Sequence, residues 1–377
     1  MTSTAIRIIG LVLLALAIAA CQSDEQKRAE YMKRGNEYLE SKDFKEAIIE
    51  YKNVLQMNPN DGEAHYQLAK AYLGDENVRE GFWQLRETVR LDPDNVQAKV
   101  DLAPMLFLAK EYDEAMAQVD AALALDPKNS QALLFKGHFL DNQGHPEEAL
   151  EAFEKAVELA PDRAEPLLIY ASALGRRGDR EKAEVWFKKA IEVAPNFTTY
   201  ATYANFLGRG EDESRDGDVV ALLRKGIEVA EPDEVPRAYT ALARFLFRRD
   251  RIDDAIATLE EGVEKSEDKL DLIYTLARFY SAQGDQKKAE ELIEQATTAQ
   301  PDQARPYLIL SAYRDRKGDL EGALAAARKA VEVEPEDEDA RLREAEVVIE
   351  LGVKAKNDDQ IAEGRALMVP RPRCASL

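Results

Sequence analysis

The residue with the most distinctive chemical setting is a cysteine near the N-terminus. Cys21 ends a run of thirteen apolar or glycine residues (8–20), and polar residues follow it directly. A thiol is a nucleophile that can accept a covalent group. The chain has one other cysteine, Cys374, near its opposite end, and two such cysteines cannot supply a disulfide framework. We therefore expect modification at Cys21, and for Cys374 either pairing between molecules or no role.

A second group of candidate ligands lies in an acidic stretch near the middle of the chain. Asp212, Ser214 and Asp216 stand at alternate positions, and Gly217 follows, which is the opening spacing of an EF-hand calcium loop. The twelfth place holds Leu223, where such a loop needs a bidentate glutamate. The pattern favours a plain acidic insertion, with calcium binding as the weaker alternative.

The chain shows no pattern of catalytic residues. Its three histidines, His65, His138 and His145, do not stand at metal-binding spacing with other ligands. The sequence contains neither HExxH nor GxSxG, and no glycine-rich phosphate loop follows a strand-like segment. We therefore expect no enzyme, no cofactor and no resident metal.

The charge balance excludes one class of partner. The chain carries 72 acidic and 51 basic residues, a net charge of −21. Nucleic-acid binding needs a basic surface that displaces counterions, so we expect no nucleic-acid partner.

The apolar run before Cys21 has the features of a secretory signal. Arg7 is the only charge before residue 24, and the run is shorter than the roughly 20 apolar residues that span a bilayer. The segment Ile18-Ala19-Ala20-Cys21 resembles the lipobox of bacterial lipoproteins. That resemblance implies cleavage after residue 20 and three acyl chains on Cys21, which then starts a short linker over 21–27. The alternatives are an ordinary signal with a chance cysteine, or a short anchor helix.

The residue that follows Cys21 indicates which membrane the lipoprotein would be anchored in. Gln22 stands where many lipoproteins retained in the inner membrane have aspartate. The resemblance therefore implies an outer-membrane anchor with the protein facing the periplasm.

The rest of the chain is a repeat of 34 residues. Prolines recur at this interval, at Pro59, Pro93, Pro127, Pro161 and Pro195, and again at Pro301 and Pro335. Each period also has a small residue in its first half, such as Gly35 or Gly137, and an alanine that opens its second half, such as Ala47 or Ala149. Apolar residues in "EEALEAFEKAVELAP" fall three and four apart, which predicts one stripe of a helix.

This pattern resembles the tetratricopeptide repeat (TPR) family, in which each repeat is a pair of antiparallel helices. The resemblance implies an all-α fold, a right-handed α-solenoid of about nine helix pairs over 28–337. The sixth repeat is degenerate and has an acidic loop at 208–218. Residues 338–368 form a partial tenth repeat or a cap, and 369–377 an irregular tail. Either residues 353–368 improvise the cap, or the natural product continues and this sequence is cut short or frameshifted.

In the TPR family, positions 2, 5, 9 and 12 of the first helices line a concave groove that binds partners. In repeats two to four these positions include Tyr66, Phe107 and His138. In repeats seven to nine they include Arg237, Arg244, Phe247, Tyr274, Arg278 and Arg305, with Arg248 nearby. Arginine recognises carboxylates in a bidentate manner, so this half could bind an acidic protein segment or an anionic polysaccharide. The alternative is that these arginines pair with Asp271, Asp315 and other acids and only hold the repeats together.

The combined features indicate a lipid-anchored, non-catalytic scaffold for protein partners. The resemblance extends to TPR lipoproteins of exopolysaccharide export and protein sorting. The alternatives are an assembly factor for a secretin or pilus channel, or the recruiting portion of a truncated larger enzyme.

The lipidation hypothesis gives a direct test. Replacing the nucleophile in Cys21→Ser should abolish labelling by a palmitate analogue and leave uncleaved or mislocalised precursor. Labelling followed by gel electrophoresis and membrane fractionation measures both effects. A wild-type chain that takes up no label, and a variant that fractionates like it, would contradict lipidation.

Overall fold

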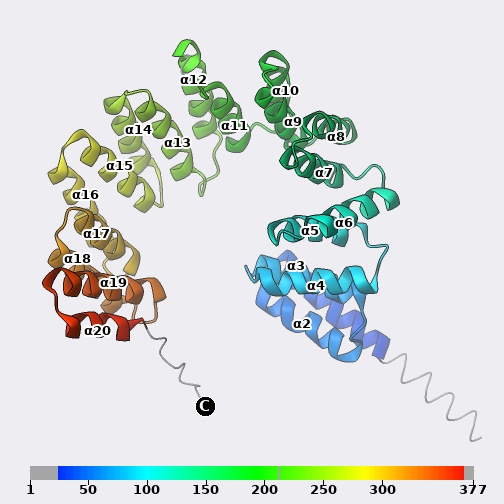
Figure 1. Cartoon of the computed structure of the whole chain (residues 1–377), viewed down its shortest axis with the longest axis horizontal. Helices are drawn as coiled ribbons and strands as arrows, with labels where there is room; N and C mark the ends of the chain where they lie inside the picture. Colours follow the sequence, from blue (N-terminus) through cyan, green and yellow to red (C-terminus); the bar gives the residue numbers. More distant parts are fainter. Residues whose placement is uncertain (1–23, 211–212, 369–377) are drawn as a thin grey trace, which may run out of the picture. The chain divides into compact units, whose positions relative to one another are not determined.

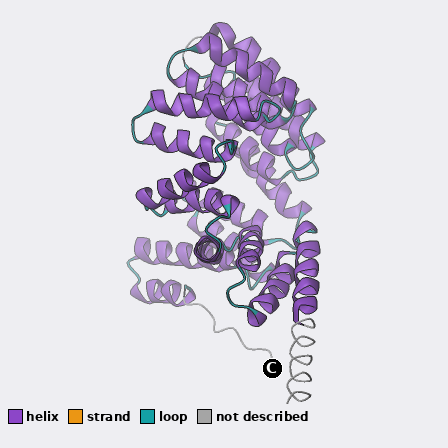
Figure 2. Ribbon diagram, turned by 90° about the vertical axis from the view of Figure 1, so that its right-hand side faces the viewer, coloured by secondary structure: helices purple, strands orange, loops and turns teal. Residues whose placement is uncertain are grey.

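The structure is a computed structural model that describes residues 24–210 and 213–368, and in these residues every regular element is helical (Figures 1 and 2). The expected all-α fold class is thereby confirmed. The predicted lipidation site Cys21, the calcium-loop residue Asp212 and the tail cysteine Cys374 lie outside the described residues. No described helix is both long enough and apolar enough to cross a membrane.

The chain divides into two compact units, which meet in sequence between Val193 and Ala194. In the first unit residues 24–40 are helical. They precede α2 (Phe44–Met57), α3 (Gly62–Gly74), α4 (Val78–Leu91), α5 (Val96–Leu108), α6 (Tyr112–Leu125), α7 (Ser130–Asn142), α8 (Pro146–Leu159), α9 (Ala164–Arg176) and α10 (Arg180–Val193).

The second unit continues the same alternation of helices and short turns (Figure 1). It comprises α11 (Phe197–Leu207), the 3-10 turn η1 (Glu213–Arg215), α12 (Asp216–Glu228), α13 (Val235–Arg248), α14 (Ile252–Lys265), α15 (Leu270–Gln283), α16 (Gln286–Ala299), α17 (Ala304–Arg316), α18 (Leu320–Val333), α19 (Glu338–Ala355) and α20 (Asp358–Leu367). Consecutive helices pack in pairs, α3 on α4 through α19 on α20, and the short turns make partners antiparallel.

Short-range chemistry sets where the helices begin. Asn95 and Asn129 each stand two residues after a repeated proline, and each caps the first helix that follows, α5 and α7. The side-chain oxygen of Asn95 accepts a hydrogen bond from the Ala98 backbone N–H at 2.9 Å, and Asn129 accepts from Ala132 at the same distance. These bonds satisfy amide groups that have no partner inside the helix. In these repeats the sequence therefore sets the start of the first helix locally.

A close approach between the two helices holds each pair together. A methyl group on Gly35 would lie 2.5 Å from Cε1 of Tyr51 in α2. Tyr51 is fully buried, and its hydroxyl donates to Oδ1 of Asn36 at 2.8 Å. In the fourth repeat, Gly137 faces the buried ring of Phe153 in the same way. The small residue in the first helix therefore leaves space for an aromatic side chain of the second helix.

Neighbouring pairs share their cores. One apolar cluster joins Ala69 of α3, Leu85 of α4 and Leu102 of α5, each fully or almost fully buried. In the second unit Ala304, Ala330 and Ala340 form a cluster across α17, α18 and α19. A helix pair thus buries its apolar face only when the next pair covers it, as expected for a repeat array.

The acidic insertion of the sixth repeat is shorter than expected. Asp216 and Asp218 were expected in the loop 208–218, but they form the first turn of α12. Acidic side chains stabilise the first turn of a helix through its dipole. Asp216 also accepts a hydrogen bond from Nε of Arg249 at 3.0 Å, and Asp218 pairs with Arg215 at 2.6 Å. These contacts extend the helix by three residues into the expected loop.

The C-terminal part of the chain forms a further helix pair. The first helix of the expected partial tenth repeat, α19, ends at Ala355. A second helix, α20, packs against it at Gly364, where an added methyl group would collide with Ile349. Because Gly364 is the only buried residue of α20, this helix is exposed over most of its surface, as the outer helix of a cap would be.

The close approach at Gly35 predicts the effect of a single methyl group. Gly35→Ala should lower the free energy of unfolding by about 1–3 kcal/mol, because the buried Tyr51 ring has no space to move. In an uncrowded helix the same exchange would stabilise by up to about 1 kcal/mol.

Gly217→Ala is the matched control, because Gly217 in α12 has open space around it. Urea denaturation of both variants measures the difference. A gain at Gly35 equal to the gain at Gly217 would contradict the close approach.

Candidate binding groove

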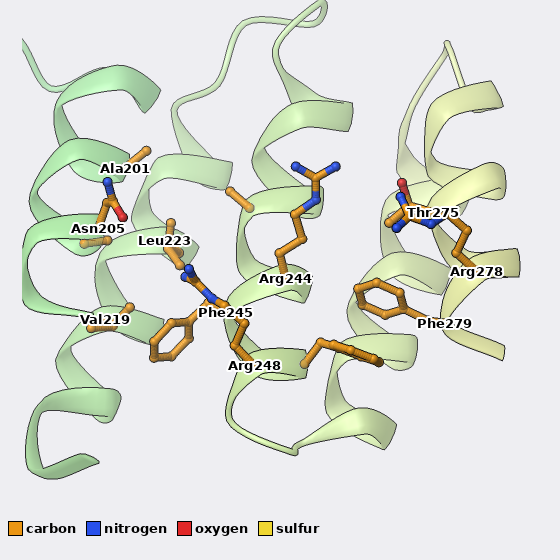
Figure 3. Close-up of a pocket in the computed structure, with 13 residues that line it drawn as sticks. Ala201, Asn205, Val219, Leu223, Arg244, Phe245, Arg248, Thr275, Arg278 and Phe279 are labelled. Atoms are coloured by element: carbon orange, nitrogen blue, oxygen red, sulfur yellow. The ribbon is translucent and has the colours of Figure 1, made fainter. Parts of the chain in front are cut away.

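The second unit contains a pocket of about 550 Å³ that is lined by four helices, α11, α12, α13 and α15 (Figure 3). We call it the arginine pocket. Its polar lining consists of Asn205, Arg244, Arg248, Thr275 and Arg278. Its apolar lining consists of Ala201, Ala204, Val219, Leu223, Ala241, Phe245, Phe247 and Phe279.

The three arginines of the pocket have no partners. Arg244, Arg248 and Arg278 are all exposed, and none forms an ion pair or a hydrogen bond with another described residue. Arg244 and Arg248 extend from α13 one turn apart, and Arg278 comes from α15 (Figure 3). None of the described residues that line this pocket is an aspartate or a glutamate. The pocket therefore presents three guanidinium groups without a neutralising carboxylate.

Aromatic rings form the apolar part of the pocket. The centroids of Phe247 and Phe279 lie 4.4 Å apart with their planes tilted by 34°. Phe245 and Phe279 are mostly buried, and Phe247 is half-buried. Rings held in this way offer a rigid surface for an apolar group, since they have already lost their rotational freedom in the core.

The two remaining arginines of the expected set are paired. Arg237 donates to Oε1 of Glu234 at 3.0 Å and lies over the ring of Phe197. Arg305 donates to Oδ1 of Asp271 at 2.6 Å. The alternative that groove arginines pair with acids of neighbouring repeats thus describes Arg305. Arg237 pairs at the start of its own helix, and the three arginines of the pocket have no described partner.

The other acid expected to pair with them has a different partner. Asp315 accepts a hydrogen bond from Nη2 of Arg343 at 2.5 Å, between α17 and α19. Tyr274, also expected in the groove, accepts from Nη2 of Arg316 at 3.1 Å. A second pocket of about 600 Å³ shares Arg244 and Arg278 with the arginine pocket. It is also lined by Tyr274, Arg237 and three aspartates, Asp233, Asp268 and Asp271. The groove surface therefore continues from one pocket into the next.

In the first unit the structure brings together two of three expected groove residues. Phe107 of α5 and His138 of α7 line one pocket of about 560 Å³. Phe107 also packs edge-on against Tyr112, Phe135 and Phe139. Tyr66 does not line this pocket, and its hydroxyl donates to Oδ2 of Asp101 at 2.9 Å. Burial, followed by the Asp101 charge, raises the pKa of Tyr66.

Several residues that line the pockets do not stand at positions 2, 5, 9 or 12, and the sequence analysis did not predict them. Phe139, Phe245 and Phe279 each follow position 9 directly, and all three line a pocket. An aromatic residue at position 10 was the sequence signal that could have found them. Val219 and Leu223 come from the second helix α12, which the first-helix pattern could not indicate.

Three observations in the described residues bear on the predicted calcium loop. The described residues contain no group of three or more histidines, cysteines or carboxylates that could hold a metal ion. Asp216 pairs with Arg249, and Leu223 is buried in the wall of the arginine pocket.

Comparison with known families places the chain in a class. The models named tetratricopeptide repeat match residues 83–130, 142–206 and 246–312, and the TPR repeat model matches residues 35–75. Together they match more than half of the chain, and the described residues form the helix pairs of this fold. The chain belongs to the tetratricopeptide repeat family.

Solved structures resemble parts of the chain. A structure of MamA is 29% identical, covers 45% of this chain and 92% of its own, and has a TM-score of 0.39. PilF of Pseudomonas aeruginosa is 19% identical, covers 54% and 93%, and has a TM-score of 0.46. YrrB, described as a TPR protein with an unusual peptide-binding site, is 21% identical, covers 47% and 92%, and has a TM-score of 0.38. None of the curated proteins matches the chain.

The setting of His138 gives a prediction on protonation. Desolvation in the pocket, followed by the charge of Arg176, lowers the pKa of His138 below its ordinary value of 6.5. NMR titration should show this lowered pKa, and Arg176→Gln should raise it, because one nearby positive charge is removed.

The same shift has a consequence for stability. Below pH 6.5 the unfolded chain takes up a proton at this residue more readily than the folded chain. The stability that His138 contributes is therefore present above this pH and lost as the pH falls through the folded pKa. A His138→Gln variant with an unchanged pH profile of unfolding would contradict this setting.

Proposed function

We propose that this chain is a non-catalytic scaffold that binds segments of other proteins in the groove formed by its first helices. The observation that carries the proposal is where the pockets lie. In the first unit the pocket joins α5 to α7, and in the second unit it joins α11, α13 and α15 together with α12. These surfaces combine aromatic rings with arginine or histidine, the residue types that binding hot spots favour.

The chemistry of the arginine pocket supports binding over catalysis. Its titratable groups are Arg244, Arg248 and Arg278. A guanidinium remains protonated in proteins and cannot serve as a general base. Among residues 24–210 and 213–368, the lining of this pocket includes no histidine, cysteine or carboxylate that could act as a base or nucleophile. Three fixed positive charges can hold an anionic partner without transforming it.

The proposal includes the membrane anchor. Acylation at Cys21 would tether the array to the outer membrane with its repeats in the periplasm. Several acyl chains hold a protein firmly, because each buried methylene contributes about 0.8 kcal/mol. A tethered groove facing the periplasm suits the assembly of an envelope secretion or polysaccharide-export system, and this is the role we propose.

Photo-crosslinking in cells tests which face binds partners. We compare a benzoylphenylalanine placed at Gln131 in α7 with one placed at Glu151 in α8. Both side chains are exposed. Irradiation should give crosslinked species from position 131 and few from position 151, because partners are expected to contact the first helices. Immunoblotting for shifted bands measures the outcome. Equal crosslinking from the two positions, or none from position 131, would overturn the groove as the binding face.

A further inference from the structure

We infer that the arginine pocket binds an acidic peptide segment that places an apolar side chain on the phenylalanines and carboxylates on the arginines. This inference rests on the proposed scaffold function and names the chemistry of one partner segment. It concerns Arg244, Arg248 and Arg278 together with Phe247 and Phe279.

The three pocket arginines differ from several other arginines of the second unit. Other arginines there have carboxylate partners: Arg224 pairs with Glu261 at 2.7 Å and Arg249 pairs with Asp216 at 2.9 Å. The chain has 72 acidic residues for 51 basic ones, so carboxylates are abundant. The pocket nevertheless gathers three positive charges and no acid.

This arrangement has an electrostatic cost in the absence of a ligand. Arg244 and Arg248 stand four residues apart on α13, where like charges repel each other. Arg278 adds a third charge from α15 to the same pocket. A carboxylate-bearing ligand would relieve this repulsion. Arginine also suits such a ligand because its planar fork donates two parallel hydrogen bonds to one carboxylate.

The apolar lining favours a peptide over a polysaccharide. Between the arginines the pocket offers Phe247, Phe279 and aliphatic side chains. A polysaccharide would need many polar partners for its hydroxyl groups, and the uncharged polar groups here are Asn205 and Thr275. The Thr275 hydroxyl already donates to the carbonyl of Asp271 at 2.9 Å. An acidic segment with one apolar side chain matches both parts of the lining.

The surface beside the pocket has room for more of the segment. Arg278 also lines a pocket of about 220 Å³ with Arg316 and Lys317, and no described acid lines it. A further pocket of about 600 Å³ shares Arg278 but is lined by three aspartates, Asp233, Asp268 and Asp271, so we expect an acidic segment to extend toward Arg316. Because Arg278 lines all three pockets, its contribution to binding should be large.

The test uses the full chain in detergent and a fluorescein-labelled peptide with one phenylalanine flanked on both sides by glutamates. Fluorescence anisotropy should show saturable binding. A peptide of the same sequence with glutamines in place of glutamates should bind about tenfold more weakly or worse. Equal binding of the two peptides would overturn the inference.

The matched variants separate these arginines from the general charge of the surface. Arg244→Gln with Arg278→Gln should weaken binding of the glutamate peptide about tenfold. Arg251→Gln with Arg328→Gln removes the same charge from arginines of the second unit that have carboxylate partners and do not line the arginine pocket or the two pockets that share Arg278, and binding should stay close to that of the wild type. An equal loss in both double variants would overturn the pocket as the site.

A second pair of variants covers a failure to fold. If circular dichroism shows that the glutamine variant has lost helicity, Arg244→Lys with Arg278→Lys keeps the charge and removes the bidentate geometry. Binding of the glutamate peptide should then fall below that of the wild type. Unchanged binding would overturn the inference. Binding of oligogalacturonate to a chain that does not bind the glutamate peptide would assign the pocket to a polysaccharide. That result would also overturn the inference.

The outcome is separable from that of the proposed scaffold. If crosslinking at position 131 captures partners while the glutamate peptide does not bind, the scaffold stands and the acidic-peptide pocket is wrong. If the peptide binds and crosslinking shows no preference for the first helices, the pocket stands and the wider groove is wrong.

Discussion

The contact between a small residue on one helix and a bulky side chain on its partner is the constraint on which the rest of this structure depends. At Gly35 and Tyr51 the helices approach so closely that a methyl group has no space. This approach fixes how the two helices cross, and the crossing fixes which apolar residues remain for the next pair to cover. Clusters such as the one joining Ala69, Leu85 and Leu102 then connect the pairs. Each unit is rigid because every pair completes the core of its neighbour.

Rigidity of this kind leaves one row of first-helix positions without a packing role. Buried residues such as Leu242 and Ala243 hold α13 in place, while Arg244 on the same helix is exposed. The groove side chains can therefore vary in chemistry without loss of the fold. This separation explains why the two units carry different pockets on the same scaffold. One presents aromatic rings and His138, and the other presents phenylalanines and arginines.

Ion pairs determine which arginines of the second unit are neutralised by a carboxylate. Asp271 stands between the repeats that carry Arg237 and Arg305, and it pairs with Arg305. Glu234 pairs with Arg237 from three residues away. These exposed pairs contribute little stability, typically below about 1 kcal/mol each, but they neutralise two of the five arginines expected in the groove. The charge that remains is concentrated in one pocket.

The sequence by itself determined the fold of this protein because the signals that specify it are local. The interval of the prolines, the capping side chains at Asn95 and Asn129, and the small residues such as Gly137 all act within one repeat. The pattern of first-helix positions also found Arg244, Phe247 and Arg278. Only the tertiary structure decided which of these arginines lack partners. That property depends on whether a carboxylate from another turn or repeat lies within reach, and the distance between such groups is set by helix packing. For the same reason the positions 2, 5, 9 and 12 did not include Val219 or Leu223. Their side chains reach the pocket because the second helix α12 packs beside the first helices, and no periodicity within a first helix encodes that contact.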